Sequence, residues 1–170
     1  MTRESKAVGS FKASKTLRVA RLSLFSALSV VGSFIHPPSP IQTVAFDSAP
    51  GFFAALYFSA LDGALISGIG HICTSIINGF PLGILHLPIA LGMAVAGGLM
   101  GLVNKANYKW SFIPATVTGI AINTGLCVVV IPTIGWAAAL AFVPFLLLAA
   151  SLNAVVATLA YIGVSGRLRI

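Results

Sequence analysis

The chain has 170 residues, of which 58% are hydrophobic and only 8% are charged, and its mean hydropathy is +1.02. A soluble domain normally carries about 25% charged residues, so this composition excludes an ordinary globular domain and predicts an all-α polytopic membrane protein. A spanning helix needs about 20 apolar residues. The length therefore allows about six spans with short loops and leaves no room for a separate soluble catalytic domain.

The net charge of +7 is concentrated before the first apolar run, around one short loop and at the end of the chain. Lys and Arg collect on the cytoplasmic side of membrane proteins, so we interpret these residues as topology signals and expect no nucleic-acid partner. We predict a basic cytoplasmic tail over residues 1–16, a membrane domain over 17–166 and a basic cytoplasmic end over 167–170. The basic residues are Arg3, Lys6, Lys12, Lys15, Arg18, Arg21, Lys105, Lys109, Arg167 and Arg169.

Six helices are predicted in chain order from the apolar runs and the residues that interrupt them. The first ends before Pro37-Pro38, and a polar, proline-rich loop follows it. Pro50 suits the first turn of the second helix, and Asp62-Gly63 is a turn signal after it. Pro88 and Pro144 predict kinks in the fourth and sixth helices. The predicted ranges are 17–35, 50–61, 64–77, 82–103, 112–131 and 135–163.

The second and third helices are short for spans, and one long helix in their place would give five spans. With a cytoplasmic N-terminus, six spans place Lys105, Lys109 and the C-terminal arginines inside, whereas five spans place them outside. The positive-inside rule therefore favours six transmembrane helices with both termini cytoplasmic. Asp62 then lies in an inner turn, and four residues lie at or near the outer face, namely Asp47, Asn78, His86 and Trp136.

The chain lacks the common motifs of nucleotide-binding proteins and hydrolases. It contains no G-x-x-x-x-G-K-[ST] phosphate loop, no H-E-x-x-H and no G-x-S-x-G. We predict that it is not an enzyme and that it needs no cofactor. An intramembrane enzyme remains an alternative, although its two candidate acids, Asp47 and Asp62, are predicted on opposite faces. A small channel or structural protein that self-associates through small residues is another.

Polar residues form a predicted constellation in this apolar chain. Between Leu22 and Asn104 the only formally charged residues are Asp47 and Asp62, and all three histidines lie in the same stretch. An ionisable group at membrane depth is a functional-site hypothesis by default, although each residue alone also fits helix–helix hydrogen bonding or the membrane interface. The histidines also permit a metal site, but we favour hydrogen bonding and expect no metal. The constellation predicts an outward-facing pocket for a small, largely neutral molecule with an aromatic ring and hydroxyls, and it comprises Asp47, His71, His86, Asn78, Asn123, Asn153 and Trp136.

The topology and several motifs resemble the substrate-binding S-components of energy-coupling factor (ECF) vitamin transporters. The shared features are six short spans, tiny loops, a basic N-terminus and the sequence G-A-L-I-S-G-I-G-H at 63–71. The segment V-A-F-D-S-A-P-G at 44–51, with Gly70-His71 and G-F-P-L-G-I-L-H at 79–86, is similar to the branch assigned to α-ribazole, a cobalamin precursor. The A-x-x-x-A stripe of the family corresponds here to Ser23-x-x-x-Ala27, preceded by Ala20.

The resemblance implies a multi-pass protein of a prokaryotic cell membrane that captures its substrate outside. It implies docking through Ala20, Ser23 and Ala27 onto a membrane-embedded T-component driven by two cytosolic ATPases. The ligand roles that we expect are Asp47 on the ribose hydroxyls, two histidines on the ring nitrogen or sugar, and an aromatic residue on the ring. These are His71 and His86, with Phe46 or Trp136 as the aromatic residue. Pyrimidine, queuosine-precursor and flavin-like ligands remain alternatives.

Overall fold

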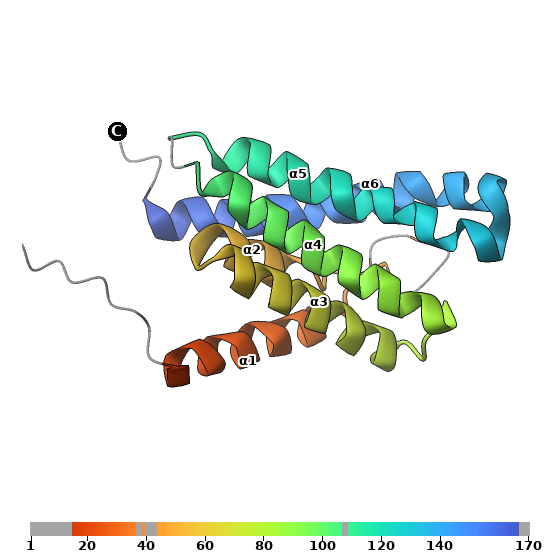
Figure 1. The fold of residues 1–170 in the computed structure, drawn as a ribbon, viewed down its shortest axis with the longest axis horizontal. Coiled ribbons are helices and arrows are strands. Elements are labelled where there is room, and N and C mark those ends of the chain that lie inside the picture. Colours follow the sequence, from red (N-terminus) through yellow and green to blue (C-terminus); the bar gives the residue numbers. More distant parts are fainter. Residues whose placement is uncertain (1–14, 37–38, 40–43, 107–108, 167–170) are drawn as a thin grey trace, which may run out of the picture.

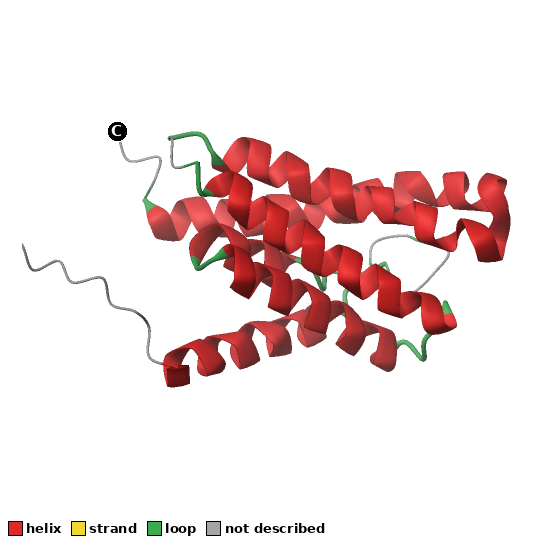
Figure 2. Ribbon diagram, in the orientation of Figure 1, coloured by secondary structure: helices red, strands yellow, loops and turns green. Residues whose placement is uncertain are grey.

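The computed structural model describes residues 15–36, 39, 44–106 and 109–166. The described chain forms a helical bundle (Figures 1 and 2). Except for Lys15 and Thr16, the predicted tails at 1–16 and 167–170 lie outside the described residues. The helices are α1 (Lys15–Gly32), α2 (Ala49–Tyr57), α3 (Ala60–Ile77), the 3₁₀ helix η1 (Gly83–Leu85), α4 (His86–Asn104), α5 (Phe112–Gly125), the 3₁₀ helix η2 (Leu126–Val130) and α6 (Ile131–Ser165).

The six predicted helices are present, but the predicted turn at Asp62-Gly63 is wrong. The chain turns at Phe58 and Ser59 instead, and Asp62 lies in the first turn of α3. Ser59 has an extended backbone and caps α3, because its side-chain oxygen accepts a hydrogen bond of 3.0 Å from the backbone N–H of Asp62. The sequence S-x-x-D thus marks the start of a helix here rather than its end.

Helices α2 and α3 form an antiparallel hairpin whose backbones approach closely at two glycines. A Cβ atom on Gly51 would lie 2.2 Å from the Ser67 hydroxyl oxygen, and one on Gly63 would lie 2.4 Å from the Ala55 Cβ. This pairing excludes the alternative of one long helix. On the other side of α3, a Cβ on Gly97 of α4 would lie 2.5 Å from the carbonyl oxygen of Gly63. Small residues therefore serve close packing within the chain.

The last two helices run side by side in opposite directions (Figure 1). The predicted helix 112–131 begins at Phe112 as expected, but its final turn is the 3₁₀ helix η2. Helix α6 begins at Ile131, before its predicted start at Gly135, whose φ of 77° and ψ of 166° break the helical path. Such a backbone conformation suits glycine. Pro144 lies within α6 without ending it.

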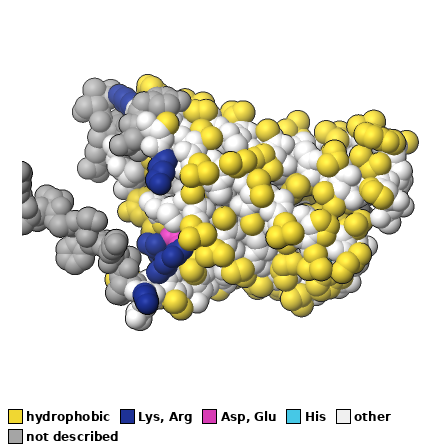
Figure 3. All heavy atoms as spheres, in the orientation of Figure 1, with side chains coloured by type: hydrophobic (Ala, Val, Ile, Leu, Met, Phe, Trp, Pro, Cys, Tyr) yellow, Lys and Arg dark blue, Asp and Glu magenta, His cyan; other side chains and the backbone are white. Residues whose placement is uncertain are grey.

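Apolar side chains cover much of the face shown in Figure 3, and the Lys and Arg side chains on this face gather at one end. Within the described residues, three helical segments are long and apolar enough to cross a membrane: Ala60–Ile77, Gly83–Asn104 and Phe112–Ser165, the last of which contains the α5–α6 pair. The nine residues of α2 rise only about 14 Å, less than half of a hydrocarbon core of about 30 Å. Membrane insertion therefore relies on α3 to α6 more than on α2.

A buried carboxylate joins α1 to α3 at the basic end. The side chain of Asp62 is fully buried, with one oxygen 2.8 Å from Arg18 Nε and the other 2.5 Å from an Arg21 guanidinium nitrogen. The Arg21 guanidinium also lies 4.7 Å from the centre of the Phe58 ring. Asp47 lies near the opposite end of α1, where a Cβ on Gly32 would contact the carbonyl oxygen of Phe46, so the two acids lie apart in the bundle.

Candidate substrate-binding site

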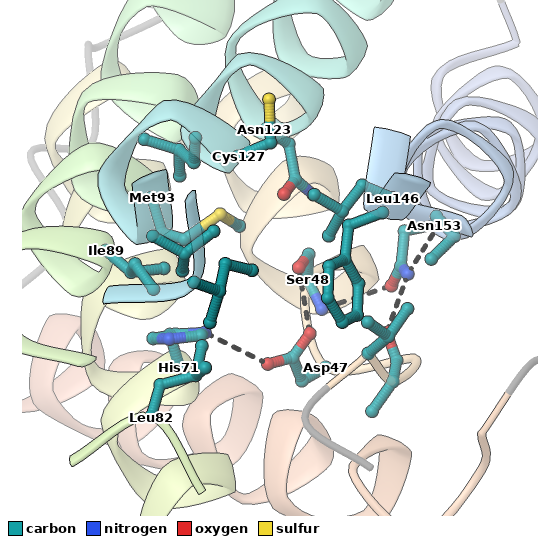
Figure 4. A pocket seen from close by; sticks show the side chains of 17 residues that line it. Asp47, Ser48, His71, Leu82, Ile89, Met93, Asn123, Cys127, Leu146 and Asn153 are labelled. Atoms are coloured by element: carbon teal, nitrogen blue, oxygen red, sulfur yellow. Dashed lines mark hydrogen bonds and ion pairs between the residues drawn. The ribbon is translucent and has the colours of Figure 1, made fainter. Parts of the chain in front are cut away.

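A cavity opens among the loop before α2, helices α3 to α6 and η2 (Figure 4). Its empty space, including the open mouth, is about 730 Å³. The polar lining residues are Asp47, Ser48, His71, Asn123 and Asn153. The apolar ones are Val44, Ala45, Leu82, Ile89, Met93, Leu126, Cys127, Val130, Ile134, Phe142, Leu146 and Ala149.

Asp47 lines this cavity and has one carboxylate oxygen without a hydrogen-bond partner among the described residues. The residue is 5% exposed, and its Oδ1 accepts a hydrogen bond of 2.9 Å from the Ser48 hydroxyl. Oδ2 lies 3.7 Å from Nδ1 of His71 (Figure 4) and has no hydrogen-bond partner among the described residues. A buried polar atom without a partner costs free energy, which makes Oδ2 a candidate acceptor of a further hydrogen bond.

Asn153 on α6 holds the loop that carries Asp47. Its Oδ1 accepts hydrogen bonds from the backbone N–H groups of Ser48 (3.1 Å) and Ala49 (2.8 Å). Its Nδ2 donates to the carbonyl oxygens of Ala45 (3.0 Å) and Ala149 (2.9 Å). These four bonds use the whole hydrogen-bonding capacity of an amide. Asn153 therefore lines the cavity as predicted, but its amide is fully used in hydrogen bonds that join the loop to α6.

The two predicted histidines are brought together, one at the cavity and one behind it. His71 lines the cavity and is 8% exposed, whereas His86 is fully buried and is not a lining residue. Nδ1 of His86 lies 3.2 Å from Nε2 of His71 and 2.8 Å from the Ser75 hydroxyl oxygen. His86 therefore contacts His71 rather than the empty space.

Of the other predicted site residues, only Asn123 lines the cavity (Figure 4). Phe46 is not a lining residue, and its backbone N–H bonds the carbonyl oxygen of Ile35 after α1. Asn78 follows the end of α3 and donates to the carbonyl oxygen of Thr74. Trp136 is 67% exposed and lies outside the lining, which fits the alternative interpretation as an interfacial aromatic residue.

Sequence reasoning missed two lining residues that matter chemically. Ser48, which donates to Asp47, was signalled only by its position next to that acid. Phe142 brings an aromatic ring to the cavity from α6, and nothing in its uniformly apolar surroundings distinguishes it in the sequence. Phe142 therefore lines the cavity, whereas Phe46 and Trp136 do not.

The predicted docking stripe lies on the free side of α1. Ala20, Ser23 and Ala27 are all exposed, whereas Ser29 on another face of the same helix is fully buried. Leu24 is also exposed, at 59%. The small stripe thus does not pack within the described chain, unlike the small residues of α2, α3 and α4.

The cavity and the fold agree with the comparison against protein-family models. The model described as "ECF transporter, substrate-specific component" matches residues 17–164. No curated protein and no solved structure is significantly similar to the chain. The matched family consists of substrate-specific transporter components rather than enzymes, and its members generally work with a T-component and ATPases. Because the match spans nearly the whole described bundle, the chain belongs to the family of ECF transporter substrate-specific components.

Proposed function

We propose that this chain captures α-ribazole, the nucleoside precursor used in cobalamin salvage, from outside the cell for delivery to the cytosol. The observation that carries the proposal is the buried, unpartnered Oδ2 of Asp47 in the wall of a cavity that is lined mostly by apolar residues. A ribose hydroxyl donates to a carboxylate in a strong, charge-assisted hydrogen bond. The apolar walls suit a flat benzimidazole ring.

The ring is expected to lie among the apolar lining residues rather than against the aromatic residues expected from sequence. Phe142, Met93 and Ile89 line the same cavity as Asp47. Aromatic pairs and sulfur–aromatic contacts favour such surroundings. His71 and Asn123 then supply the remaining polar contacts to the sugar or to a ring nitrogen. Among the described residues no Lys or Arg lines the cavity, so an anionic ligand has no countercharge there.

The first test identifies the ligand directly. Small molecules carried through purification of the protein are released and measured by mass spectrometry, and α-ribazole is the expected result. A queuosine precursor, a pyrimidine or a flavin in its place would overturn the ligand assignment and leave the transporter class intact.

A second test addresses the site by titration calorimetry. Asp47→Ala removes the only carboxylate among the described residues that line the cavity, so binding of α-ribazole is expected to be lost while the helical fold survives. Asn78→Ala is the matched control, because Asn78 lies outside the lining, and its affinity should equal that of the wild type. Unchanged binding in Asp47→Ala contradicts the assignment.

We propose that delivery requires docking of α1 on a T-component driven by two cytosolic ATPases. The proposal includes six spans with both termini in the cytoplasm and the cavity facing outward before docking. Its support is the exposure of Ala20, Ser23 and Ala27 on α1, since small residues let helices approach closely in lipid. The basic end of the bundle, with Arg18 and Arg21, is then the cytoplasmic end.

Co-purification with the T-component and the ATPases tests this docking surface. Ala27→Leu adds bulk to the stripe and is expected to abolish co-purification without changing ligand affinity. Ala138→Leu makes the same change at an exposed alanine of α6 and should leave co-purification intact. If crosslinking instead shows a stable homo-oligomer that Ala27→Leu disrupts, the stripe serves self-association and the docking proposal is wrong.

A further inference from the structure

A chain of hydrogen bonds behind the cavity fixes where the hydrogen of each histidine lies. It starts at Leu82, whose backbone N–H donates to Nε2 of His86 at 3.3 Å. That nitrogen must therefore carry a lone pair. A neutral imidazole has its hydrogen on the other nitrogen, so His86 carries its hydrogen on Nδ1.

The hydrogen on Nδ1 of His86 in turn decides the state of His71. The Ser75 hydroxyl donates to the carbonyl oxygen of His71 at 2.7 Å, so its oxygen accepts from His86 Nδ1 at 2.8 Å. Nε2 of His71 faces the same N–H at 3.2 Å, and a hydrogen on it would collide with that N–H. His71 therefore carries its hydrogen on Nδ1, the nitrogen that faces Asp47.

We propose that His86 is a positioning residue that sets His71 as a hydrogen-bond donor beside the open acceptor of Asp47. The distance of 3.7 Å between His71 Nδ1 and Asp47 Oδ2 is too long for a direct hydrogen bond, so both groups remain for a ligand. The inference takes the cavity as a substrate site and in that respect rests on the proposed function.

A hydrogen-bond donor on His71 beside an acceptor on Asp47 defines the chemical class of the ligand group that binds here. A hydroxyl, or two neighbouring hydroxyls of a sugar, accepts from His71 and donates to Asp47 at adjacent points. An ionised carboxylate has acceptor oxygens only. It therefore has no hydrogen to donate to Asp47 and faces a charge of the same sign there. The site therefore selects hydroxyl-bearing ligands over carboxylates of similar size, and His86 contributes to this selection without touching the ligand.

Nuclear magnetic resonance of the full chain, labelled with ¹⁵N-histidine and kept in detergent without ligand, tests the tautomers directly. Both His71 and His86 are expected with hydrogen on Nδ1. In His86→Leu this preference of His71 should be lost. In His86→Asn it should return, because the side-chain amide of Asn can donate from near the position of Nδ1. A wild-type His71 with its hydrogen on Nε2 overturns the inference, and this measurement needs no variant to fold.

Ligand affinity gives the second readout. His86→Leu should bind α-ribazole about tenfold or more weakly, and His86→Asn should recover most of that loss. Analogues methylated on the ribose hydroxyls should also bind the wild type about tenfold more weakly. Wild-type affinity in His86→Leu contradicts the positioning role.

The two readouts separate this inference from the proposed function. If α-ribazole does not bind but His71 carries its hydrogen on Nδ1, the ligand assignment fails, and the assignment of His71 as donor and Asp47 as acceptor stands. If α-ribazole binds tightly but His71 carries its hydrogen on Nε2, the ligand assignment stands and the role of His86 fails.

Discussion

Replacement of Asn153 by Leu should disconnect the Asp47 loop from α6. Leu has a similar volume, so the packing of α6 is largely kept while all four hydrogen bonds of the amide are removed. The loop then loses its attachment at Ala45, Ser48 and Ala49. Asp47, which lies inside this span, is no longer held at the cavity wall, and both stability and ligand affinity should fall.

The size of the stability loss follows from the bonds removed. Hydrogen bonds inside membrane proteins average about 0.6 kcal/mol, so four of them contribute about 2 kcal/mol. The buried backbone N–H of Ser48 also loses its partner, which adds about 1 kcal/mol or more. We expect Asn153→Leu to lower the free energy of unfolding by about 3–4 kcal/mol and to weaken ligand binding at least tenfold.

Asn104 provides a matched control at the opposite end of the bundle. It is also a buried asparagine, and its amide bonds the carbonyl oxygen of Leu56 and the hydroxyl of Ser111. Asn104→Leu should cost about 1 kcal/mol of stability and leave ligand affinity unchanged. Unfolding in mixed detergent micelles and titration calorimetry measure the two quantities. The reasoning is refuted if Asn153→Leu keeps wild-type affinity, or if both variants weaken binding equally.

Two further predictions concern the helix contacts. Gly63→Ala would place a Cβ 2.6 Å from the Ala55 Cα and should lower the free energy of unfolding by about 1–3 kcal/mol. Gly163→Ala is the control, because its Cβ would meet nothing within 4 Å, and it should be neutral or stabilising in the same micelle assay. Equal losses of stability in the two variants would contradict the packing argument. Asp62→Asn removes the charge that binds Arg18 and Arg21, so amide hydrogen exchange should accelerate in α1 and not in α5. Unchanged protection of the α1 amides would show that other contacts hold this helix.

The sequence predicts helices well where strong local signals end them. Asn78-Gly79-Phe80-Pro81 ends α3 at the predicted residue, since Gly79 has a φ of 72°. The turn before α3 was missed because Asp62-Gly63 has two interpretations. Gly63 is required by the contact with Ala55 rather than by a turn, and Asp62 follows the cap Ser59. The S-x-x-D signal for a helix start was present in the sequence and was overlooked.

Four residues of the predicted constellation line the cavity, namely Asp47, His71, Asn123 and Asn153. Asp62, which was predicted apart from Asp47, binds Arg18 and Arg21 and is not a lining residue. The rotation of each helix about its axis could not be predicted, because helices with apolar residues on every side give no sign of which face is inward. For that reason Trp136 was expected at the cavity and Phe142 was not, and His86 was expected to touch the ligand together with His71, whereas only His71 lines the cavity.

The close contact between Gly32 and Phe46 has a thermodynamic consequence. A Cβ on Gly32 would lie 2.1 Å from the carbonyl oxygen of Phe46, so the end of α1 rests directly on the loop that carries Asp47. A ligand that shifts this loop changes the free energy of any state in which α1 moves. Linkage requires such coupling to be reciprocal. If the ligand changes the affinity of a partner for α1 by some factor, the partner changes the affinity for the ligand by the same factor. Only a residue without a side chain permits this contact, so the strength of that coupling depends on a single glycine.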